Sequence, residues 1–172
     1  MRSTFRVLTA LLAASLAVLT AVPAGPASAA GPAANTRVLP VAGATDDAGS
    51  AFAGTFTIDE FTAADDQLMA IGTVDGTLRD ATGNSVGTVS GVTAAFPVTA
   101  AQATCTILDL NLGAVGLTVL GVVVQLDPVH LNVGAEPGGL VGTLLCLIAG
   151  LLGGGAPPTA AVEPLNRLLP LL

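Results

Sequence analysis

The segment at residues 105–134 reads CTILDLNLGAVGLTVLGVVVQLDPVHLNVG, and in it large aliphatic side chains alternate with polar or small ones. Such period-two alternation predicts short antiparallel strands with one buried face. Turns are predicted at residues 113–116 and at Asp127–Pro128, where glycine or proline interrupts the pattern. The segment therefore predicts a β-meander with one continuous apolar face, made of Leu108, Leu110, Leu112, Leu117, Val119, Val122, Val124, Leu126, Val129, Leu131 and Val133.

The sequence before this segment continues the strand pattern. Apolar and polar residues alternate at 52–58, and strand-like runs at 68–78 and 86–92 flank a Gly-Asn turn at 79–85. Glycines lie inside these runs at positions 72, 76, 87 and 91. Because glycine in a strand marks bends and bulges, they are expected to let the sheet curl. The predicted fold is mainly β, of the α+β class: a curled antiparallel meander of about six strands packed against one apolar C-terminal helix.

That helix is predicted at residues 137–152, which are uncharged after Glu136 and rich in leucine. It carries two adjacent stripes, Leu140, Leu144, Leu147 and Leu151, and Val141, Leu145, Ile148 and Leu152. A helix that is apolar nearly all round is buried or spans a membrane. Spanning needs about 20 residues, and the glycines and the Pro157–Pro158 pair shorten the run, so packing on the sheet is favoured. Residues 156–172 are predicted to form a proline-rich linker and a short final helix.

The N-terminal 30 residues have the pattern of a secretory signal peptide. Arg2 and Arg6 precede an apolar run at 7–22, and small residues around Ala29 and Ala30 follow it. An uncleaved membrane anchor is the alternative, but the run is shorter than a spanning helix. We therefore expect a secreted, extracellular protein, cleaved near Ala29 or Ala30. After that come a flexible lead-in at 31–50, with at most one edge strand, and a single β-rich domain at 51–155.

The chain contains two cysteines, Cys105 at the start of the meander and Cys146 within the predicted helix. In an exported chain two cysteines most simply form one disulfide. This disulfide is expected to tie the helix to the sheet.

The composition excludes several classes of partner. The chain has a net charge of −7 and no Lys, Trp or Tyr; beyond residue 30, three arginines face twelve carboxylates, a net charge of −9. Nucleic-acid binding relies on Lys and Arg against phosphates and on aromatic stacking, and anionic lipids attract basic surfaces. We therefore expect no nucleic acid among its partners.

No catalytic residue, metal site or cofactor is predicted. His130 is the only histidine, and the alternation directs it outward beside Asn132. Eight carboxylates lie between residues 46 and 80, namely Asp46, Asp47, Asp59, Glu60, Asp65, Asp66, Asp75 and Asp80. A solubilising acidic surface is favoured for them, and Ca²⁺ binding stays open because their spacing matches no D-x-D-x-D-G loop.

The apolar face is the remaining candidate for function. A curled sheet under an apolar helix can keep an aliphatic cavity, and a lipid or other aliphatic ligand would then lie among Leu108, Leu110, Val122, Val124, Leu131, Leu144 and Ile148. The alternative is an extracellular surface or matrix protein-protein interaction module, whose partner would be a cell-envelope protein. Ile107, Leu120 and Val123 interrupt the alternation on the polar side, as a second packing layer or an exposed patch, and Leu120 and Val123 are its candidate contacts. A hydrolase using His130 ranks third.

The runs 105–113, 116–126 and 129–135 and the Leu-Leu-Cys element at 144–146 resemble small secreted actinobacterial proteins of unknown function. The resemblance covers about residues 50–155 and rests on the L-x-L-x-L and L-L-C elements. It implies export and a shared fold, and it carries no activity, cofactor or catalytic residue.

Overall fold

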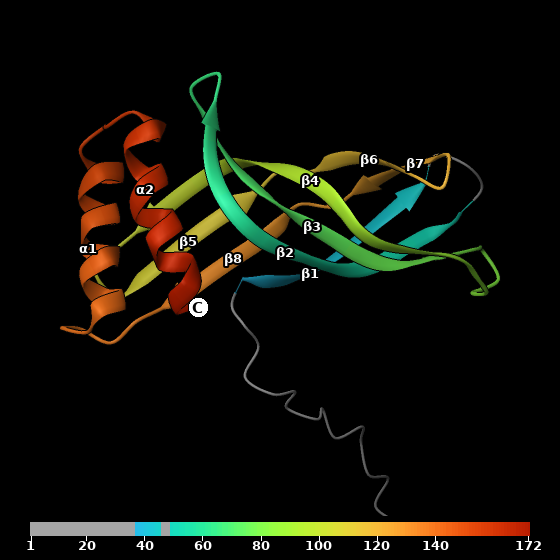
Figure 1. Cartoon of the computed structure of the whole chain (residues 1–172), viewed down its shortest axis with the longest axis horizontal. Helices are drawn as coiled ribbons and strands as arrows, with labels where there is room; N and C mark the ends of the chain where they lie inside the picture. Colours follow the sequence, from blue (N-terminus) through green and yellow to red (C-terminus); the bar gives the residue numbers. More distant parts are fainter. Residues whose placement is uncertain (1–36, 46–48) are drawn as a thin grey trace, which may run out of the picture. The chain divides into compact units, whose positions relative to one another are not determined.

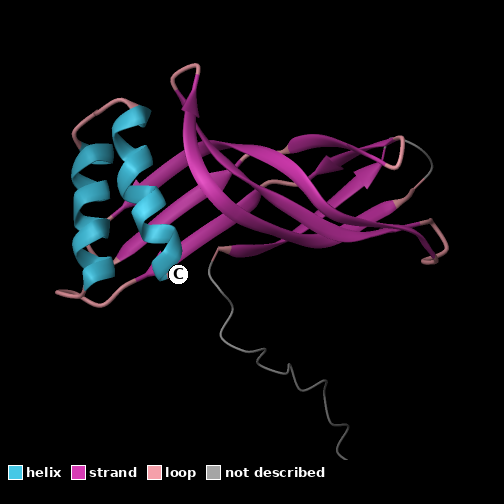
Figure 2. Cartoon of the chain, viewed as in Figure 1, coloured by secondary structure: helices cyan, strands magenta, loops and turns pink. Residues whose placement is uncertain are grey.

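The computed structural model describes residues 37–45 and 49–172, shown in Figures 1 and 2. The predicted signal peptide at 1–30 therefore lies outside the described residues. The strands are β1 (Val38–Thr45), β2 (Ala51–Ala64), β3 (Gln67–Arg79), β4 (Ser85–Ala103), β5 (Ile107–Leu112), β6 (Val115–Val119), β7 (Val122–Leu126) and β8 (Val129–Gly134). The helices are α1 (Leu140–Gly153), α2 (Pro158–Leu168) and the short 3₁₀ turn η1 (Leu169–Leu171). The predicted class, a β-dominated α+β fold with antiparallel strands, is confirmed.

The sheet has the strand order β6-β7-β1-β2-β3-β4-β5-β8, so the described residues contain eight strands rather than about six. Strands β1 to β5 follow one another as a meander, but the β6–β7 hairpin pairs with β1, and β8 returns to pair with β5. The prediction of one meander over 105–134 is therefore wrong. Alternation shows which face of a strand is buried. The pairing of strands is made by backbone hydrogen bonds, which form whatever the side chains are, so the alternation does not show which strands are neighbours.

The prediction of a flexible lead-in at residues 31–50 with at most one edge strand is corrected by β1, which residues 38–45 form. It pairs with β2 along most of its length and with β7 at Gly43, Ala44 and Thr45. Its side chains alternate between buried and exposed, although Pro40 and several small residues weaken that pattern in the sequence. Pro40 precedes residues 43–45, which are the ones that pair with β7. Its missing backbone N–H therefore removes no hydrogen bond from the β1–β7 ladder.

The long strands β2, β3 and β4 curve around the core, as Figure 1 shows. The ladders contain register shifts at Ile58/Glu60, at Val74/Gly76 and at Val98/Ala100, and such bulges bend a strand. Inside the curl, side chains from every strand and both helices form one buried apolar cluster. The expected curling of the sheet is thus present, with bulges beside the glycine-rich stretches.

Gly72 is the point of closest backbone approach in this curl. It lies opposite Ile58, and a Cβ atom on it would collide with the carbonyl oxygen of Thr57 and lie 2.8 Å from the ring of Phe56. The β2–β3 ladder therefore requires glycine at this position.

Gly72→Ala is expected to lower the free energy of unfolding by about 1–3 kcal/mol, because the added methyl group displaces backbone atoms. Urea denaturation of both proteins measures the difference. The matched control is Gly134→Ala in β8, where a Cβ would meet no atom within 4 Å. Equal stability of the two variants would show that the β2–β3 ladder can relax around the methyl group.

Helices α1 and α2 pack on each other and cover one end of the strands (Figure 2). Helix α1 lies on β4 and β5, and α2 lies on β2 and β3. The helix predicted at 137–152 begins three residues later than expected, because Gly138 has a φ of +83° and residues 137–138 form a turn. Within the described part of the chain, no helix has the length and apolarity needed to cross a bilayer.

Asn166 fastens α2 to the sheet. Its Oδ1 accepts a hydrogen bond from the Phe61 N–H at 2.6 Å, and its Nδ2 donates to the Phe61 carbonyl oxygen at 2.9 Å. Phe61 lies in β2 beyond the residues that pair with β1. The asparagine amide therefore takes the place that a neighbouring strand occupies elsewhere along β2.

Asn166→Ala is expected to lower the free energy of unfolding by about 1–3 kcal/mol, because it leaves both Phe61 backbone groups without this partner. Thermal and urea unfolding measure the loss. The control is Arg167→Ala, which removes only an exposed ion pair to Glu163 and should cost less than about 1 kcal/mol. A loss of similar size in both variants would contradict a specific role for the amide.

Candidate functional site

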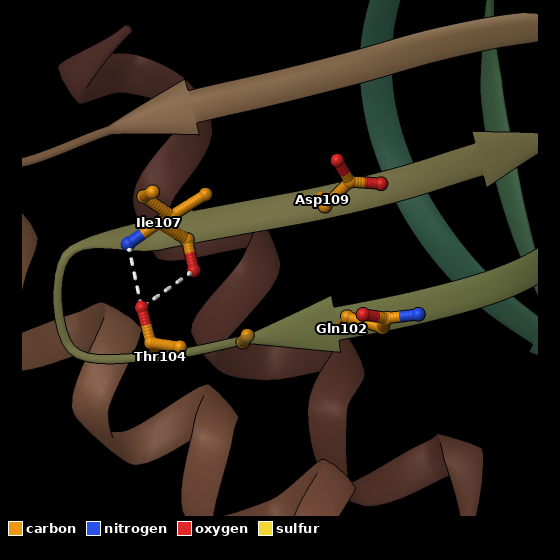
Figure 3. Close-up of a pocket in the computed structure, with 5 residues that line it drawn as sticks. Gln102, Thr104, Ile107 and Asp109 are labelled. Carbon is orange, nitrogen blue, oxygen red and sulfur yellow. Dashed lines mark hydrogen bonds between the residues drawn. The ribbon is translucent and has the colours of Figure 1, made fainter.

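The residues predicted to line an aliphatic cavity are largely part of the core. Leu108, Leu110, Val124, Leu131 and Ile148 are buried, and Val122 and Leu144 are half-buried. The surface depressions over β4 and β5 (Figure 3), beside the helices and between β4 and β6 are lined by other residues. Binding of a lipid or other aliphatic ligand between these side chains stays a prediction.

A polar row crosses three strands on the outer face of the sheet. Gln102 of β4 lies opposite Asp109 of β5, which lies opposite Asn132 of β8. A depression of about 280 Å³ lies over the β4–β5 part of this row, where Thr104 bonds both backbone groups of Ile107 (Figure 3).

His130 projects from this outer face, as the alternation predicts, and it has a partner that sequence reasoning did not find. Its Nε2 lies 2.9 Å from Asp109 Oδ1, and Asn132 Nδ2 donates to Asp109 Oδ2 at 3.2 Å. The pair supplies a base and an orienting acid, two of the three groups of a hydrolytic triad. Both contacts of this cluster go to Asp109, one from His130 and one from Asn132, and neither involves a serine, threonine or cysteine. We interpret the cluster as a cross-strand contact that fastens β8 to β5.

The acidic segment is distributed over several elements. Asp46 and Asp47 lie outside the described residues, and the other six carboxylates lie in β2, in β3 and in the two turns that flank β3. Among the described residues, no three carboxylate, histidine or cysteine side chains come together as a metal site would require. Asp75 has a structural role, since its Oδ1 accepts hydrogen bonds from Ser90 Oγ and from the N–H of Gly91.

Asp80 organises the β3–β4 turn. Its Oδ1 accepts hydrogen bonds from the hydroxyl and backbone N–H of Thr82 and from the backbone N–H of Asn84. The Thr82 hydroxyl, helped by the Asn84 N–H, holds the pKa of Asp80 below its ordinary value of 3.8, because both stabilise the ionised carboxylate.

Asp80→Asn is expected to lower the melting temperature slightly at neutral pH and to have no effect in acid. The pKa of Asp80 is lower in the folded than in the unfolded chain. The carboxylate therefore stabilises the fold above its unfolded-state pKa, and this contribution disappears as the pH falls through the folded-state pKa. Melting temperatures measured from neutral to acidic pH test this, with Asp127→Asn in the β7–β8 turn as control. A difference between wild type and Asp80→Asn that is constant across the range would contradict it.

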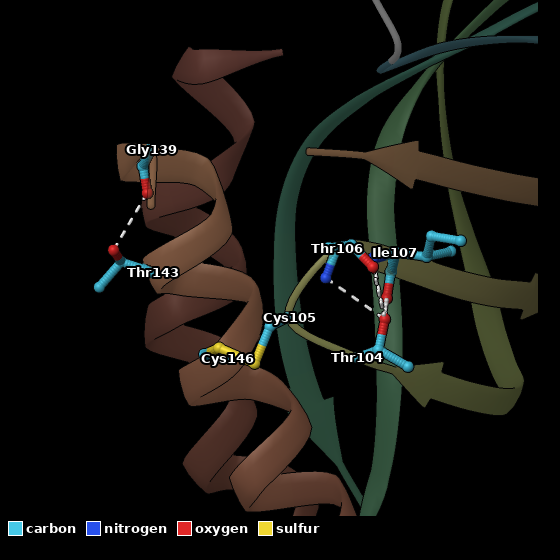
Figure 4. Close-up of a disulfide and its surroundings, with 7 residues drawn as sticks. All are labelled: Thr104, Cys105, Thr106, Ile107, Gly139, Thr143 and Cys146. Atoms are coloured by element: carbon cyan, nitrogen blue, oxygen red, sulfur yellow. Dashed lines mark hydrogen bonds between the residues drawn. A yellow bond between two sulfur atoms is a disulfide. The ribbon is translucent and has the colours of Figure 1, made fainter. Parts of the chain in front are cut away.

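Cys105 and Cys146 form the predicted disulfide (Figure 4). It joins the β4–β5 loop to the middle of α1. The loop itself is shaped by Thr104, whose Oγ1 accepts hydrogen bonds from the N–H groups of Thr106 and Ile107. Helix α1 is thereby held to the sheet by a covalent bond as well as by packing.

The outer face of α1 is apolar except for Thr143, with exposed residues at 140, 143, 147 and 150 and half-buried ones at 144 and 151. We define it as Leu140, Thr143, Leu144, Leu147, Gly150 and Leu151. Of the two stripes in the sequence, the one with Leu145 and Ile148 faces the core, and Leu140 and Leu147 of the other remain 67% and 53% exposed. Thr143 lies on the side of α1 away from the strands, and its hydroxyl donates to the Gly139 carbonyl oxygen (Figure 4).

A second group of exposed aliphatic residues lies near the β6–β7 turn, at the end of the strands opposite the helices (Figure 1). Leu120 is 63% and Val123 is 44% exposed. Ile107, the first residue of β5, is exposed as well but does not belong to this group. The three residues that interrupt the alternation thus form no second packing layer. Leu120 has a φ of +52°, an unusual conformation for leucine, in a two-residue turn with Gly121.

Comparisons with protein-family models, with curated proteins and with solved structures found no match to this chain. The resemblance to small secreted actinobacterial proteins therefore stays a prediction.

Proposed function

We propose that this chain is an exported, non-enzymatic interaction protein that contacts another protein chain through the outer face of α1. The observation that carries the proposal is the exposure of Leu140 and Leu147 on a helix that has no charged residue. Half-buried Leu144 lies between these two leucines, and apolar patches that a folded protein leaves exposed mark interaction sites.

The chemistry of this face suits a dry contact. The only side-chain hydroxyl on α1 belongs to Thr143, and it is already bonded within the helix. The only cysteine of the helix is in the disulfide. Covering the face therefore leaves no polar side chain of α1 without a partner, and this avoids the main cost of burying a surface.

A protein partner is favoured over a membrane surface by the same composition. Helices that lie in a membrane interface carry Lys or Arg on the polar face and aromatic residues near the headgroups. Helix α1 has neither, and the whole chain has a net charge of −7, which opposes binding to anionic lipids.

The preorganised helix also keeps the entropy cost of association low, because the disulfide and the core already fix its position.

Export is part of the proposal. It is supported by the signal-peptide pattern at residues 1–30 and by a disulfide, a bond that persists mainly in oxidising compartments. We expect the mature protein to begin at Ala30 or Gly31. Intact-mass measurement of protein recovered from outside the producing cells checks this, and a mass that includes residues 1–29 would contradict it.

The contact surface is tested by hydrophobic-interaction chromatography of the disulfide-bonded protein at high dilution. Leu140→Gln/Leu147→Gln is expected to elute much earlier than the wild type, because it removes the exposed aliphatic groups of α1. The control is Val86→Gln/Val123→Gln, which removes two exposed aliphatic groups elsewhere. Elution of the α1 variant with the wild type would reject the outer face of α1 as an accessible contact surface.

A further inference from the structure

We infer that the Cys105–Cys146 disulfide is a site of thiol–disulfide exchange with a second protein that carries a pair of cysteine thiols. Both residues are exposed, although cysteine is among the residues most often buried in folded proteins. Exchange requires that a thiolate reach a sulfur atom, and exposed disulfides are accordingly the labile and regulatory ones. The covalent bond between α1 and the β4–β5 loop is therefore open to attack (Figure 4).

A surface depression adjoins each cysteine. The first has a volume of about 280 Å³ and lies beside the loop that carries Cys105, since Thr104 and Ile107 line it (Figure 3). The second has a volume of about 250 Å³ and lies between β4 and α1. Its lining includes Ala149, which follows Cys146 by about one helical turn. The disulfide thus lies beside concave surface on both the loop and the helix.

The two depressions meet on β4, because Gln102 and Ala103 line both of them. Most residues of the second depression are small, namely Ala101, Ala103, Ala149 and Gly153. Small residues let the backbone of another chain come close to the surface. An extended protein segment can therefore lie along β4 across both depressions and bring a cysteine side chain to the disulfide. This surface favours a protein thiol over a small free thiol, which needs no such contact.

The charges around the disulfide allow a thiolate to approach. The net charge of −7 repels anions over most of the surface. The loop residues 104–106 and the whole of α1, however, carry no charge. Asp109 is the carboxylate that lines the first depression, and its oxygens already contact His130 and Asn132. The repulsion of an incoming thiolate is therefore weakest where the two sulfur atoms lie.

The exchange takes place in two steps. A thiolate of the incoming chain attacks one sulfur of the pair and forms a mixed disulfide with it, while the Cys105–Cys146 bond breaks and the other sulfur leaves as a thiolate. The second thiol of the incoming chain, as its thiolate, then attacks the mixed disulfide, closes a disulfide within the incoming chain and releases the remaining cysteine. The two protons lost by the incoming thiols return through water to Cys105 and Cys146. Two electrons thus pass from the dithiol to the disulfide, and α1 loses its covalent link to the β4–β5 loop.

Reduction of the native, disulfide-bonded protein by dithiothreitol tests whether the sulfur atoms are accessible. The rate is expected to lie within about tenfold of the rate for the same protein unfolded in urea, because attack needs no opening of the fold. If attack required global unfolding, the native protein would react at least about 1,000-fold more slowly. A native rate that falls outside the expected range would overturn the inference.

A short synthetic peptide with a Cys-x-x-Cys pair tests the kind of thiol. Gln102→Trp places a large side chain over both depressions, and it is expected to react several times more slowly than the wild type with the peptide but equally fast with dithiothreitol. Ala149→Gln enlarges a side chain in the second depression and should act in the same direction. The control is Gln125→Trp, which makes the same change at an exposed position of β7 and should react as the wild type does with both thiols. Circular dichroism shows whether each variant is folded.

The outcomes decide the kind of partner. Peptide rates that are the same for Gln102→Trp, Ala149→Gln and the wild type would overturn the binding of a protein segment in the depressions. Equal slowing with the peptide and with dithiothreitol would overturn it as well, because the new side chains would then only cover the sulfur atoms. The exchange needs no contact with the outer face of α1, so the chromatography described above decides the proposed function separately.

Discussion

Replacing both Cys105 and Cys146 with serine is expected to lower the free energy of unfolding by about 4 kcal/mol. The disulfide joins positions 41 residues apart, and closing a loop of that length removes much conformational entropy from the unfolded chain. Domains of this size have a total stability of about 5–15 kcal/mol, so the variant should lose a large share of it. Helix α1 should also detach more readily, since it then depends on packing alone.

Urea denaturation of the double variant and the oxidised wild type measures this loss. The reduced wild type serves as a control, because it lacks the same bond without a change of side chain, and it should match the double variant. A difference below about 1 kcal/mol between oxidised and reduced protein would show that the unfolded chain gains little freedom when the bond is absent.

Phe56→Ala should have an effect of similar size, about 3–5 kcal/mol. The ring is fully buried at the centre of the curled sheet, and its centroid lies 4.5 Å from that of Phe96, at an interplanar angle of 47°. The variant loses the transfer free energy of the ring and leaves a cavity. It also loses a tilted ring contact worth about 0.5–1.5 kcal/mol.

Chemical denaturation of Phe56→Ala, with Val123→Ala as an exposed control, measures the effect. The control should change the free energy of unfolding by less than about 0.5 kcal/mol. A double-mutant cycle with Phe56→Leu and Phe96→Leu isolates the contact between the rings. A loss below about 1.5 kcal/mol for Phe56→Ala would mean that the core collapses around the missing ring.

Burial within strands could be predicted from the sequence because it depends on local geometry. The alternation at 105–134 placed Leu108, Leu110 and Leu131 inside and His130 outside, as the structure has them. It could not predict the contact between His130 and Asp109. These residues meet only because β8 pairs with β5, and nothing in the alternation distinguishes that pairing from a continuous meander.

The two stripes of α1 show a similar limit. Both are made of large aliphatic residues, so periodicity alone cannot decide which one faces the sheet. The packing of α2 against α1, and the disulfide at Cys146, determine the orientation. The role of Asn166 could not be predicted from the sequence, because a single asparagine in a short helix has no distinctive pattern. Its role follows only from the position of its amide beside the backbone of Phe61.

The disulfide has a further consequence for the covalent integrity of the chain. The residues between Cys105 and Cys146 include all of β5 to β8 and the exposed turn at Leu120 and Gly121. A single proteolytic cut at that turn would produce two fragments that sulfur still holds together. The nicked molecule would run as one species in a denaturing gel without reductant, and it would separate into two bands only after a thiol is added.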